Sequence, residues 1–362
     1  MTRLDLDGDV VDLLQALIDV ESVSGNEQEL ADAVEAALTG RSHLQLTRFG
    51  NNVVARTDLG RDSRIVVAGH LDTIPVAGNL PSTRTTLVGD DGLDGVEVIT
   101  GRGSCDMKAG VAVALSCAAT LLEPSRDVTW IFYDNEEVQA DLNGLGLLAE
   151  AHPELLAGDF AVLGEPSNAV VEGGCQGTLR VTITLTGTAA HSARAWMGHN
   201  AIHDAADLLG RLAAYEPRTV DIDGLTYREG LNAVKITGGI AGNVIPDRCE
   251  VQINHRFAPD RTVEQAFAHV AEVFDGYELV LSDSSPGALP GLDRPAAQEF
   301  IAAVGGDPAP KFGWTDVARF SQLGVPAVNF GPGNPSKAHA DDEFCPVAEV
   351  YACRDALLRW LG

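Results

Sequence analysis

Residues 64–73 have the sequence RIVVAGHLDT, a β-branched run that ends in a histidine and an aspartate. The run Arg64–Gly69 predicts a buried strand, because valine and isoleucine suit a pleated surface that is packed on both sides. His70 and Asp72 are two residues apart, so in an extended chain both side chains project to the same side. Open α/β sheets bind ligands just beyond the carboxyl ends of their strands, and this segment therefore predicts a ligand site.

The segments that follow this strand predict the rest of an α/β fold. An apolar helix is expected over Lys108–Leu122 and a strand over Val128–Tyr133, and a further strand, Phe160–Leu163, ends at a Gly-Glu-Pro turn. Strands that alternate with helices are typical of a mostly parallel sheet flanked by helices. The Gly-, Asp- and Thr-rich stretch 74–103 is expected to be a long surface loop.

The element pattern changes after Gly177, where the sequence predicts a β-α-β-β-α-β order, the ferredoxin-like α+β unit. Its strands are expected at 178–186, 232–239, 249–257 and 278–281, and its helices at 201–215 and 262–274. Helix, strand and Gly-rich loop resume after this unit, so we expect it to be inserted into the first domain. The expected domains are 1–176 with 289–362, and 177–288. Two domains suit a chain of 362 residues, because a single core stops growing at roughly 250–300 residues.

Composition excludes several classes of partner. Lys and Arg number 25 against 52 Asp and Glu, which gives a net charge of −27. Such an acidic surface repels nucleic acid and anionic membranes, and we expect neither as a partner. No apolar run reaches the ~20 residues of a membrane helix and the acidic N-terminus has no apolar signal segment, so a cytoplasmic location is expected. The six cysteines form no CxxC pair and are expected to be thiols.

Two further segments place carboxylates beside predicted elements. Asp106 lies in the loop GRGSCDMKAG directly before the apolar helix, where it could cap that helix or bridge two metal ions. Glu136 and Glu137 follow the strand 128–133 and point in different directions. One of them could therefore bind a metal while its neighbour handles a proton, which is the division of labour that a metal hydrolase needs.

Glu165 follows the strand 160–163, and His339 lies in a Gly- and Pro-rich loop near the C-terminus. Taken singly, each candidate has an ordinary structural explanation: a strand-end histidine, a helix cap, a solvated acidic pair, a turn or a surface histidine. Taken together, two histidines and three carboxylates make a ligand set for two divalent ions and leave Glu136 as a base. Imidazoles and carboxylates without a thiolate favour zinc, with cobalt or manganese as alternatives. No phosphate-cradling glycine loop or GxSxG nucleophile elbow competes with this interpretation.

Five of these motifs resemble the signatures of a known family. In chain order they are GHLDT, GRGSCDMKAG, DNEEV, GEPS and AHADDE, and they are similar to those of the aminoacylase/carboxypeptidase family of dinuclear zinc hydrolases. The resemblance implies a zinc-peptidase-like catalytic domain with an inserted lid and dimerisation domain. It also implies two Zn²⁺ per subunit, with Co²⁺ as an alternative in one or both sites, and a homodimer formed through the inserted domain.

The same resemblance implies the metal ligands, which are His70, Asp106, Glu137, Glu165 and His339. In this family pattern His70 and Glu165 would hold one zinc ion and Glu137 and His339 the other. Asp106 would bridge both ions.

The resemblance implies catalytic and substrate-binding residues as well. Asp72 would orient the first histidine ligand, and Glu136 would be the general base. His191, in the inserted domain, would reach the partner subunit's active site and stabilise the oxyanion. Substrate contacts are implied for Arg256, Asn243, Thr178, Gly313, Thr315 and Asn334. The arginine fork suits a substrate carboxylate, although an ordinary ion pair is the simpler explanation of Arg256 alone.

Three longer segments, 164–181, 187–203 and 243–259, resemble one branch of the family. Members of that branch release succinate from N-succinyl-LL-2,6-diaminopimelate in lysine and diaminopimelate biosynthesis, so a small N-acyl amino acid is the expected substrate. Better-studied members carry a basic pair where this chain has Cys175-Gln176, so part of the anion recognition differs. The alternatives are an acetylornithine deacetylase, a small-peptide carboxypeptidase or aminoacylase and, more remotely, a non-catalytic metal-binding protein on this scaffold.

Overall fold

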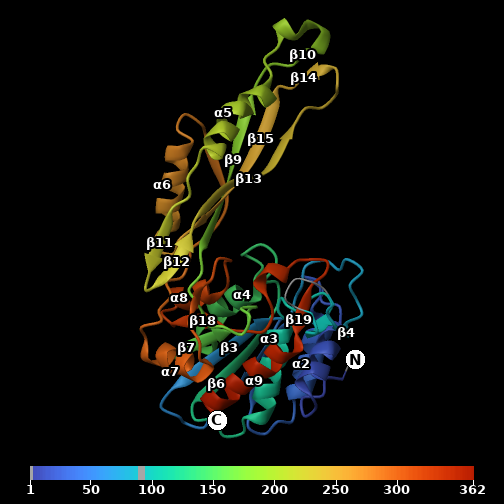
Figure 1. Ribbon diagram of the computed structural model, residues 1–362, viewed down its shortest axis with the longest axis vertical. Helices are drawn as coiled ribbons and strands as arrows, with labels where there is room; N and C mark the ends of the chain where they lie inside the picture. Colours follow the sequence, from blue (N-terminus) through green and yellow to red (C-terminus); the bar gives the residue numbers. More distant parts are fainter. Residues whose placement is uncertain (1–2, 89–93) are drawn as a thin grey trace. The chain divides into compact units, whose positions relative to one another are not determined.

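The computed structural model describes residues 3–88 and 94–362, and the chain divides into two compact units. The first unit comprises Met1–Gly173, Pro290–Ala309 and Thr315–Gly362, and the second comprises Gly174–Leu289 and Pro310–Trp314. The chain thus leaves the first unit and returns to it, as the colours of Figure 1 show. The second unit begins at Gly174 instead of the expected residue 177, and Pro310–Trp314, which was assigned to the first domain, belongs to it.

An eight-stranded sheet lies at the centre of the first unit, in the order β1-β2-β6-β3-β7-β18-β8-β17. β3 pairs in parallel with β6 and β7, and β7 pairs in parallel with β18, whereas β1–β2, β2–β6 and β18–β8 are antiparallel. The mostly parallel centre confirms the predicted α/β fold. The strands are β1 (Gln45–Phe49), β2 (Asn52–Arg56), β3 (Arg64–His70), β6 (Asp127–Tyr133), β7 (Phe160–Leu163), β8 (Glu172–Gly173), β17 (Ala309–Pro310) and β18 (Ala327–Asn329).

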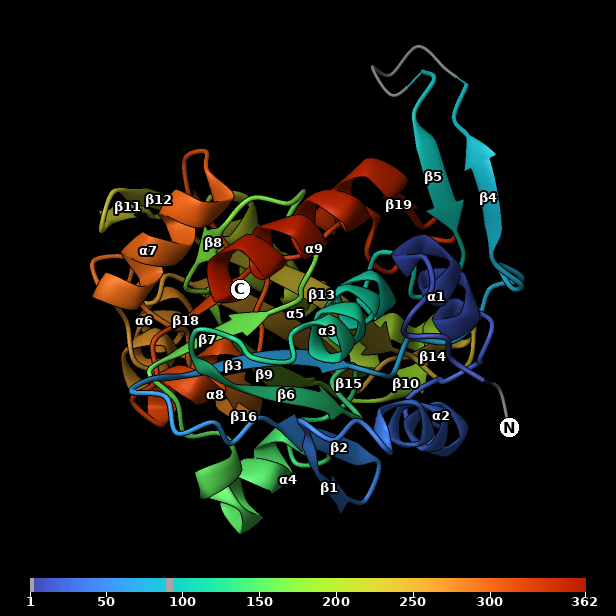
Figure 2. The same cartoon turned by 90° about the horizontal axis from the view of Figure 1, so that it is seen from below.

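Helices cover both faces of this sheet. The longer elements are α1 (Val10–Ile18), α2 (Gln28–Leu38), α3 (Lys108–Thr120), α4 (Gly144–Ala151), α7 (Pro295–Val304), α8 (Val317–Gln322) and α9 (Val347–Leu361), with short 3-10 turns η1 (Pro153–Leu155) and η3 (Pro335–Lys337). Figure 2 shows α1, α3 and α9 on one face and α2, α4 and α8 on the other. Every residue of α3 except Thr120 is buried, which explains its small and apolar composition without a polar stripe.

The segment expected to be a surface loop, residues 74–103, contains two strands. β4 (Thr83–Thr86) pairs antiparallel with β5 (Glu97–Thr100), and β5 pairs with β19 (Phe344–Pro346). Residues 89–93 of this segment lie outside the described residues. The loop prediction was wrong because β5 pairs with a strand near the other end of the chain, and β4 then pairs with β5. Local composition does not reveal such a long-range partner.

The second unit is built on a four-stranded antiparallel sheet in the order β13-β15-β9-β16, the ferredoxin-like arrangement that the sequence predicts. Alternate residues of β9 and β15 point into a core that α5 and α6 complete. The elements are β9 (Gly177–Thr186), β10 (Ala190–His191), η2 (Ser192–Met197), α5 (Ala201–Ala213), β11 (Thr219–Ile222), β12 (Leu225–Arg228), β13 (Gly230–Gly238), β14 (Val244–Ile245), β15 (Arg248–Phe257), α6 (Val263–Val273) and β16 (Leu279–Ser285). Among residues 3–88 and 94–362, no helix has the length and apolar content needed to cross a bilayer.

Candidate metal centre

Imidazole and carboxylate side chains meet in the first unit beyond the carboxyl ends of three strands. His70 is the last residue of β3, Glu136 and Glu137 follow β6, and Glu165 follows β7. Because β3 pairs in parallel with both β6 and β7, the three loops leave the sheet at the same edge. Asp106 joins them from the loop before α3, and His339 joins them from the loop after η3.

Asp72 connects two of these loops. Its backbone carbonyl lies 3.0 Å from Nδ1 of His70, so the imidazole can donate this N–H to it and present Nε2 to the centre. Its carboxylate, 3.5 Å from the same nitrogen, accepts hydrogen bonds from the backbone amides of Glu136 and Glu137, each 3.0 Å long. The Ser24 hydroxyl donates to the same carboxylate over 2.7 Å. Asp72 therefore contacts the His70 imidazole and also holds the loop that carries both glutamates.

The loop that presents Asp106 is held by Glu343. The carboxylate of Glu343, which is 2% exposed, accepts hydrogen bonds from the backbone amides of Gly103, Cys105 and Asp106 over 2.8–3.1 Å. It also pairs with the guanidinium of Arg102 at 3.0 Å. The Asp106–Met107 peptide bond within this loop is cis. Sequence reasoning did not single out Glu343, whose only signal is its place at the end of the AHADDE motif.

The position of Glu165 depends on glycines. A Cβ atom at Gly110 of α3 would lie 2.0 Å from the carbonyl oxygen of Gly164, and one at Gly331 would lie 2.3 Å from the same oxygen. The helix and the loop after β18 therefore approach the end of β7 by backbone contact, which only glycine permits. This packing sets Glu165, which is 5% exposed, against the start of α3 and next to the Asp106 loop.

His339, whose side chain is 53% exposed, forms the more exposed side of the centre and contacts the buried side chain of Glu137. Nε2 of His339 lies 2.9 Å from a carboxylate oxygen of Glu137 and 3.5 Å from one of Asp106. His339 has φ +67°, a left-handed conformation that is uncommon for a residue with a side chain. Asn135, directly before the two glutamates, has φ +57°. Both turns carry local backbone strain, which is typical of functional sites.

The donor set suits two divalent cations. Ligand atoms of His70, Asp106 and Glu165 lie within 4.8 Å of one another, and so do those of Asp106, Glu137 and His339. Asp106 belongs to both groups and could serve two ions. Nitrogen and carboxylate oxygen without thiolate is a donor set that zinc accepts.

The charges of the centre also fit a cation. Hydrogen bonds with Asp106 and Glu137 raise the pKa of His339 to about 10. Burial alone would lower the pKa of His70, but its bonds with Asp106 and Asp72 outweigh this and raise it well above its usual value. Both shifts show a strongly negative local potential, which a divalent ion would neutralise.

Like Glu137, whose pKa burial also raises, Glu136 shares a cluster of donor atoms with His70. Loss of hydration raises its pKa well above the ordinary value of a glutamate, and the nearby carboxylates of Glu165 and Asp316 add to the rise. No hydrogen bond from a histidine to the Glu136 carboxylate is found among the described residues, in contrast to the bond that Glu137 makes. A carboxylate of raised pKa next to a cation site is suited to accept and return a proton near neutral pH.

Four predicted residues of the second unit, the catalytic candidate His191 and three substrate contacts, fall into two groups. His191 pairs opposite Val244 between β10 and β14, and the carbonyl of Asn243 accepts the Ser192 amide over 2.9 Å. Thr178 lies opposite Arg256 between β9 and β15. These groups occupy opposite ends of the unit, because β15 extends ten residues, or roughly 33 Å, between them (Figure 1). Within this unit the structure therefore does not bring His191 and Arg256 together.

Two of the remaining predicted contacts, Thr315 and Asn334, have structural partners of their own. Thr315 is buried and donates to the side-chain oxygen of Asn329 over 2.8 Å. Asn334 caps the 3-10 turn η3, since its side-chain oxygen accepts the Ser336 amide over 2.9 Å. Gly313 belongs to the second unit, whereas Thr315 and Asn334 belong to the first.

Comparison with known proteins identifies relatives over the whole chain. Residues 66–362 match the model of peptidase family M20/M25/M40. A succinyl-diaminopimelate desuccinylase of Corynebacterium glutamicum is 48% identical over 370 residues, with 99% of this chain and 98% of the relative covered. A protein of Mycobacterium tuberculosis that carries the same name provisionally is 53% identical over 362 residues, with 99% of each chain covered.

Solved structures share the fold at lower sequence identity. A tripeptidase from Staphylococcus aureus superposes with a TM-score of 0.77 at 21% identity, and the match covers 99% of this chain and 98% of the other. A metallo-carboxypeptidase of the M20 family from Sulfolobus solfataricus superposes with a TM-score of 0.75 at 17% identity, covering 98% of both chains. At these identities the likeness establishes the fold alone.

Proposed function

This chain belongs to peptidase family M20/M25/M40, and from that premise we propose that it hydrolyses N-succinyl-LL-2,6-diaminopimelate to succinate and LL-2,6-diaminopimelate. The observation that carries the proposal is the 48% identity, over nearly the full length of both chains, to a relative named for this activity. The reaction contributes to lysine and diaminopimelate biosynthesis. Its substrate is a small N-acyl amino acid.

The proposed cofactor is a pair of zinc ions, with cobalt as an alternative. His70 and Glu165 would hold one ion, Glu137 and His339 the other, and Asp106 would bridge them; the two clusters of donor atoms that share Asp106 support this division. When bound, the ions would polarise the amide carbonyl and make a water molecule more acidic.

The chain's own residues would move the protons. Glu136 would accept a proton from the attacking water and deliver it to the departing amine, a role supported by its raised pKa. Asp72 would keep Glu136 in place through the hydrogen bond to its backbone amide. His191 of the partner subunit would donate a hydrogen bond to the carbonyl oxygen as negative charge develops on it.

The proposed substrate contacts remain those suggested by the sequence: Arg256, Asn243, Thr178, Gly313, Thr315 and Asn334. Arg256 would bind a substrate carboxylate, and its neighbour Thr178 would line the same side of the sheet. Asn243 lies beside His191 and would act together with it across the subunit boundary.

We further propose a homodimer formed through the second unit. β13 is an edge strand of the four-stranded sheet, and it exposes Val234 and Ile236 to 55% and 51%. An exposed apolar edge strand favours pairing with another chain. In light scattering, Ile236→Glu should give a monomer. Val280→Glu, an equally exposed position on the opposite edge strand β16, should leave the dimer intact. The reverse pattern would place the interface on β16.

A cytoplasmic location is part of the proposal. All six cysteines are thiols, which suits a reducing compartment. The acidic chain, with its net charge of −27, offers no attraction for nucleic acid or anionic membranes.

The test of the proposed function is a hydrolysis assay with the zinc-reconstituted protein. It would offer N-succinyl-LL-2,6-diaminopimelate, N-acetylornithine and a dipeptide separately, and record kcat/KM for each. We expect a strong preference for the succinyl substrate. Preference for N-acetylornithine or the dipeptide would move the protein to a sister activity of the family. No turnover of any substrate with two metals bound would indicate a non-catalytic metal-binding protein.

A further inference from the structure

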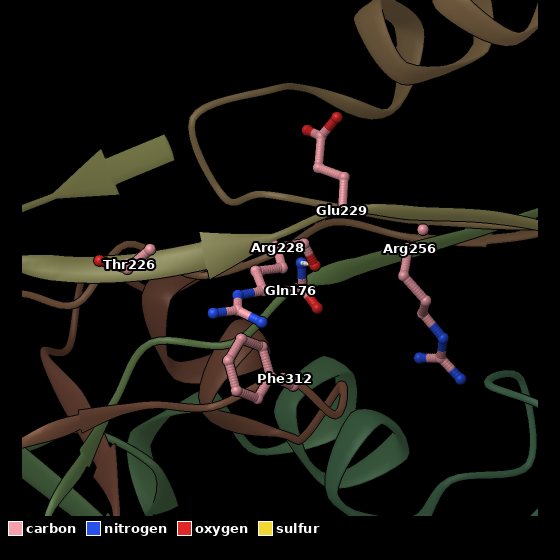
Figure 3. A pocket seen from close by; sticks show the side chains of 7 residues that line it. Gln176, Thr226, Arg228, Glu229, Arg256 and Phe312 are labelled. Carbon is pink, nitrogen blue, oxygen red and sulfur yellow. Dashed lines mark hydrogen bonds between the residues drawn. The ribbon is translucent and has the colours of Figure 1, made fainter. Parts of the chain in front are cut away.

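A pocket of about 580 Å³ lies within the second unit, close to the end of β12 (Figure 3). It is lined by Gln176, Thr226, Arg228, Glu229, Gly230, Arg256 and Phe312. All of these residues belong to the second unit. Its volume falls in the range of roughly 300–1,000 Å³ that is usual for small-molecule sites.

Two arginines face this pocket from the same side of the sheet. Gly230 pairs with Arg256 between β13 and β15, and Arg228 precedes Gly230 by two residues. Side chains two apart along an extended chain share a face, so Arg228 and Arg256 project together. Figure 3 shows both guanidinium groups on the side of the sheet opposite to Glu229. Both arginines are exposed, and among the described residues neither forms an ion pair.

Glu229, the one carboxylate among the residues that line the pocket, does not neutralise them. Glu229 is 5% exposed, and its carboxylate lies 2.8 Å from the guanidinium of Arg218 and 3.4 Å from that of Arg261. Its charge is therefore balanced by these two arginines on the far side of the strand. Asp283, whose charge acts on Arg256, lies 3.8 Å from the guanidinium of Arg180. The lining of the pocket thus holds two arginines and a single carboxylate that is already paired.

A buried glutamine and a phenylalanine form part of the lining of this pocket. Gln176 is 2% exposed, and its side-chain amide donates to the carbonyl oxygen of Arg228 over 2.6 Å. This bond holds the backbone from which the Arg228 side chain leaves. Phe312, which lines the same pocket, adds an apolar surface beside the Arg228 guanidinium.

From these contacts we propose that Arg228 is a second carboxylate-binding residue of the pocket. Arg228 and Arg256 together hold one carboxylate of an aliphatic ligand, whose methylene groups lie against Phe312. Two guanidinium forks can each donate paired N–H groups to one carboxylate, which fixes its orientation as well as its charge. The inference rests on the proposed function in one respect: the substrate supplies that carboxylate, either from its succinyl group or from its diaminopimelate part.

The test is direct binding measured by calorimetry on the full-length, zinc-loaded protein. Succinate and LL-2,6-diaminopimelate would be titrated separately into the wild type, Arg228→Gln, Arg228→Lys and the control Arg248→Gln, which removes an exposed arginine at the opposite end of β15. Arg228→Gln should bind one of the two ligands about 10- to 100-fold more weakly. Arg228→Lys should recover part of that loss, and Arg248→Gln should bind as the wild type does.

The ligand that is weakened identifies the source of the carboxylate. Weaker succinate binding assigns the pocket to the acyl group, and weaker diaminopimelate binding assigns it to the amino-acid part. A wild type that binds neither ligand, or an Arg228→Gln variant that binds both as tightly as the wild type, would overturn the assignment. Because binding is measured without turnover, a protein that hydrolyses none of the test substrates but shows the Arg228 effect would refute only the proposed function.

Discussion

Glu136 and Glu137 are neighbours in sequence, but they contact different groups. Glu137 lies 2.9 Å from Nε2 of His339 and belongs to a cluster of donor atoms with Asp106. Burial raises the pKa of both carboxyl groups, but the hydrogen bond with His339 acts to lower that of Glu137. At the scale of single residues, the hydrogen bond with His339 distinguishes Glu137 from Glu136, the proposed base.

Glu136→Gln should keep both metals, but its kcat should fall by about 10²- to 10⁴-fold, because an amide cannot accept the proton. Glu137→Gln is the matched variant, and it should lose metal as well as activity. Metal content by mass spectrometry and steady-state kinetics would separate the two effects. A metal-replete Glu136→Gln enzyme with near-normal turnover would refute the assignment of Glu136 as the base.

Glu343 should act as a positioning residue for the Asp106 loop. In Glu343→Gln, an NH₂ group replaces a carboxylate oxygen that in the wild type accepts hydrogen bonds from backbone amides. The loop therefore loses charge-assisted hydrogen bonds. We expect about 10- to 100-fold weaker zinc binding, measured by competition with a chromogenic chelator. Asp341→Asn, at an exposed position in the same motif, should bind zinc normally. Unchanged zinc affinity in Glu343→Gln would rule out this role.

Sequence reasoning selected the residues that cluster because each follows a predicted strand or lies in a motif. It could not find Glu343, since the bonds that matter reach backbone amides more than two hundred residues away. It also could not separate His191 from Arg256 in space. That separation depends on the length and direction of β15, which no local pattern around either residue contains.

At the scale of elements, hydrophobic runs were sufficient to predict β3, β6, β7 and the buried helix α3. These elements fill a core, so their composition reflects their surroundings directly. β4 and β5 were missed because both are short, β4 is exposed throughout, and the pairing of β5 with β19 is a long-range contact. The backbone contact between α3 and the end of β7 was not foreseen either, because a glycine inside a helix reveals nothing about its neighbour.

Gly110→Ala should destabilise the protein by about 1–3 kcal/mol, because the new Cβ would meet the Gly164 carbonyl oxygen at 2.0 Å. The gain of roughly 1 kcal/mol in helix propensity is too small to offset this clash. Gly210→Ala in α5 is the matched control, since its Cβ would meet nothing within 4 Å. That control should be neutral or slightly stabilising. Urea denaturation of both variants would measure the difference, and equal effects would contradict the packing argument.

At the scale of the whole molecule, the second unit distributes its candidate residues over its two ends. His191 and Asn243 lie beside β14, and Thr178 and Arg256 lie at the other end of β15. The proposed homodimer would explain this arrangement, because one chain could bind substrate with its own Arg256 while His191 of the partner subunit reaches the same substrate.

Mixing His191→Ala with Glu136→Ala subunits should restore activity that neither variant has alone. Each mixed dimer would contain one centre with its own Glu136 and an intact histidine from the partner. Random exchange would therefore return about a quarter of the wild-type turnover. The control is a mixture of Glu136→Ala with Glu137→Gln subunits, which alters both centres and should stay inactive. If the first mixture also stays inactive after proven exchange, His191 does not act across subunits.

Asp72 contacts two different loops, and this restricts where the genes of two related proteins can be joined to make a chimaera. Its carbonyl serves the histidine of its own loop, while its carboxylate serves two amides of the loop after β6. A chimaeric gene with a crossover between residues 73 and 127 would join an aspartate from one parent to amides from the other. Such a chimaera keeps the hydrogen bonds from Asp72 to the Glu136 and Glu137 amides only when the two loops have the same relative position in both parents. The two segments are thus best exchanged as one inherited block.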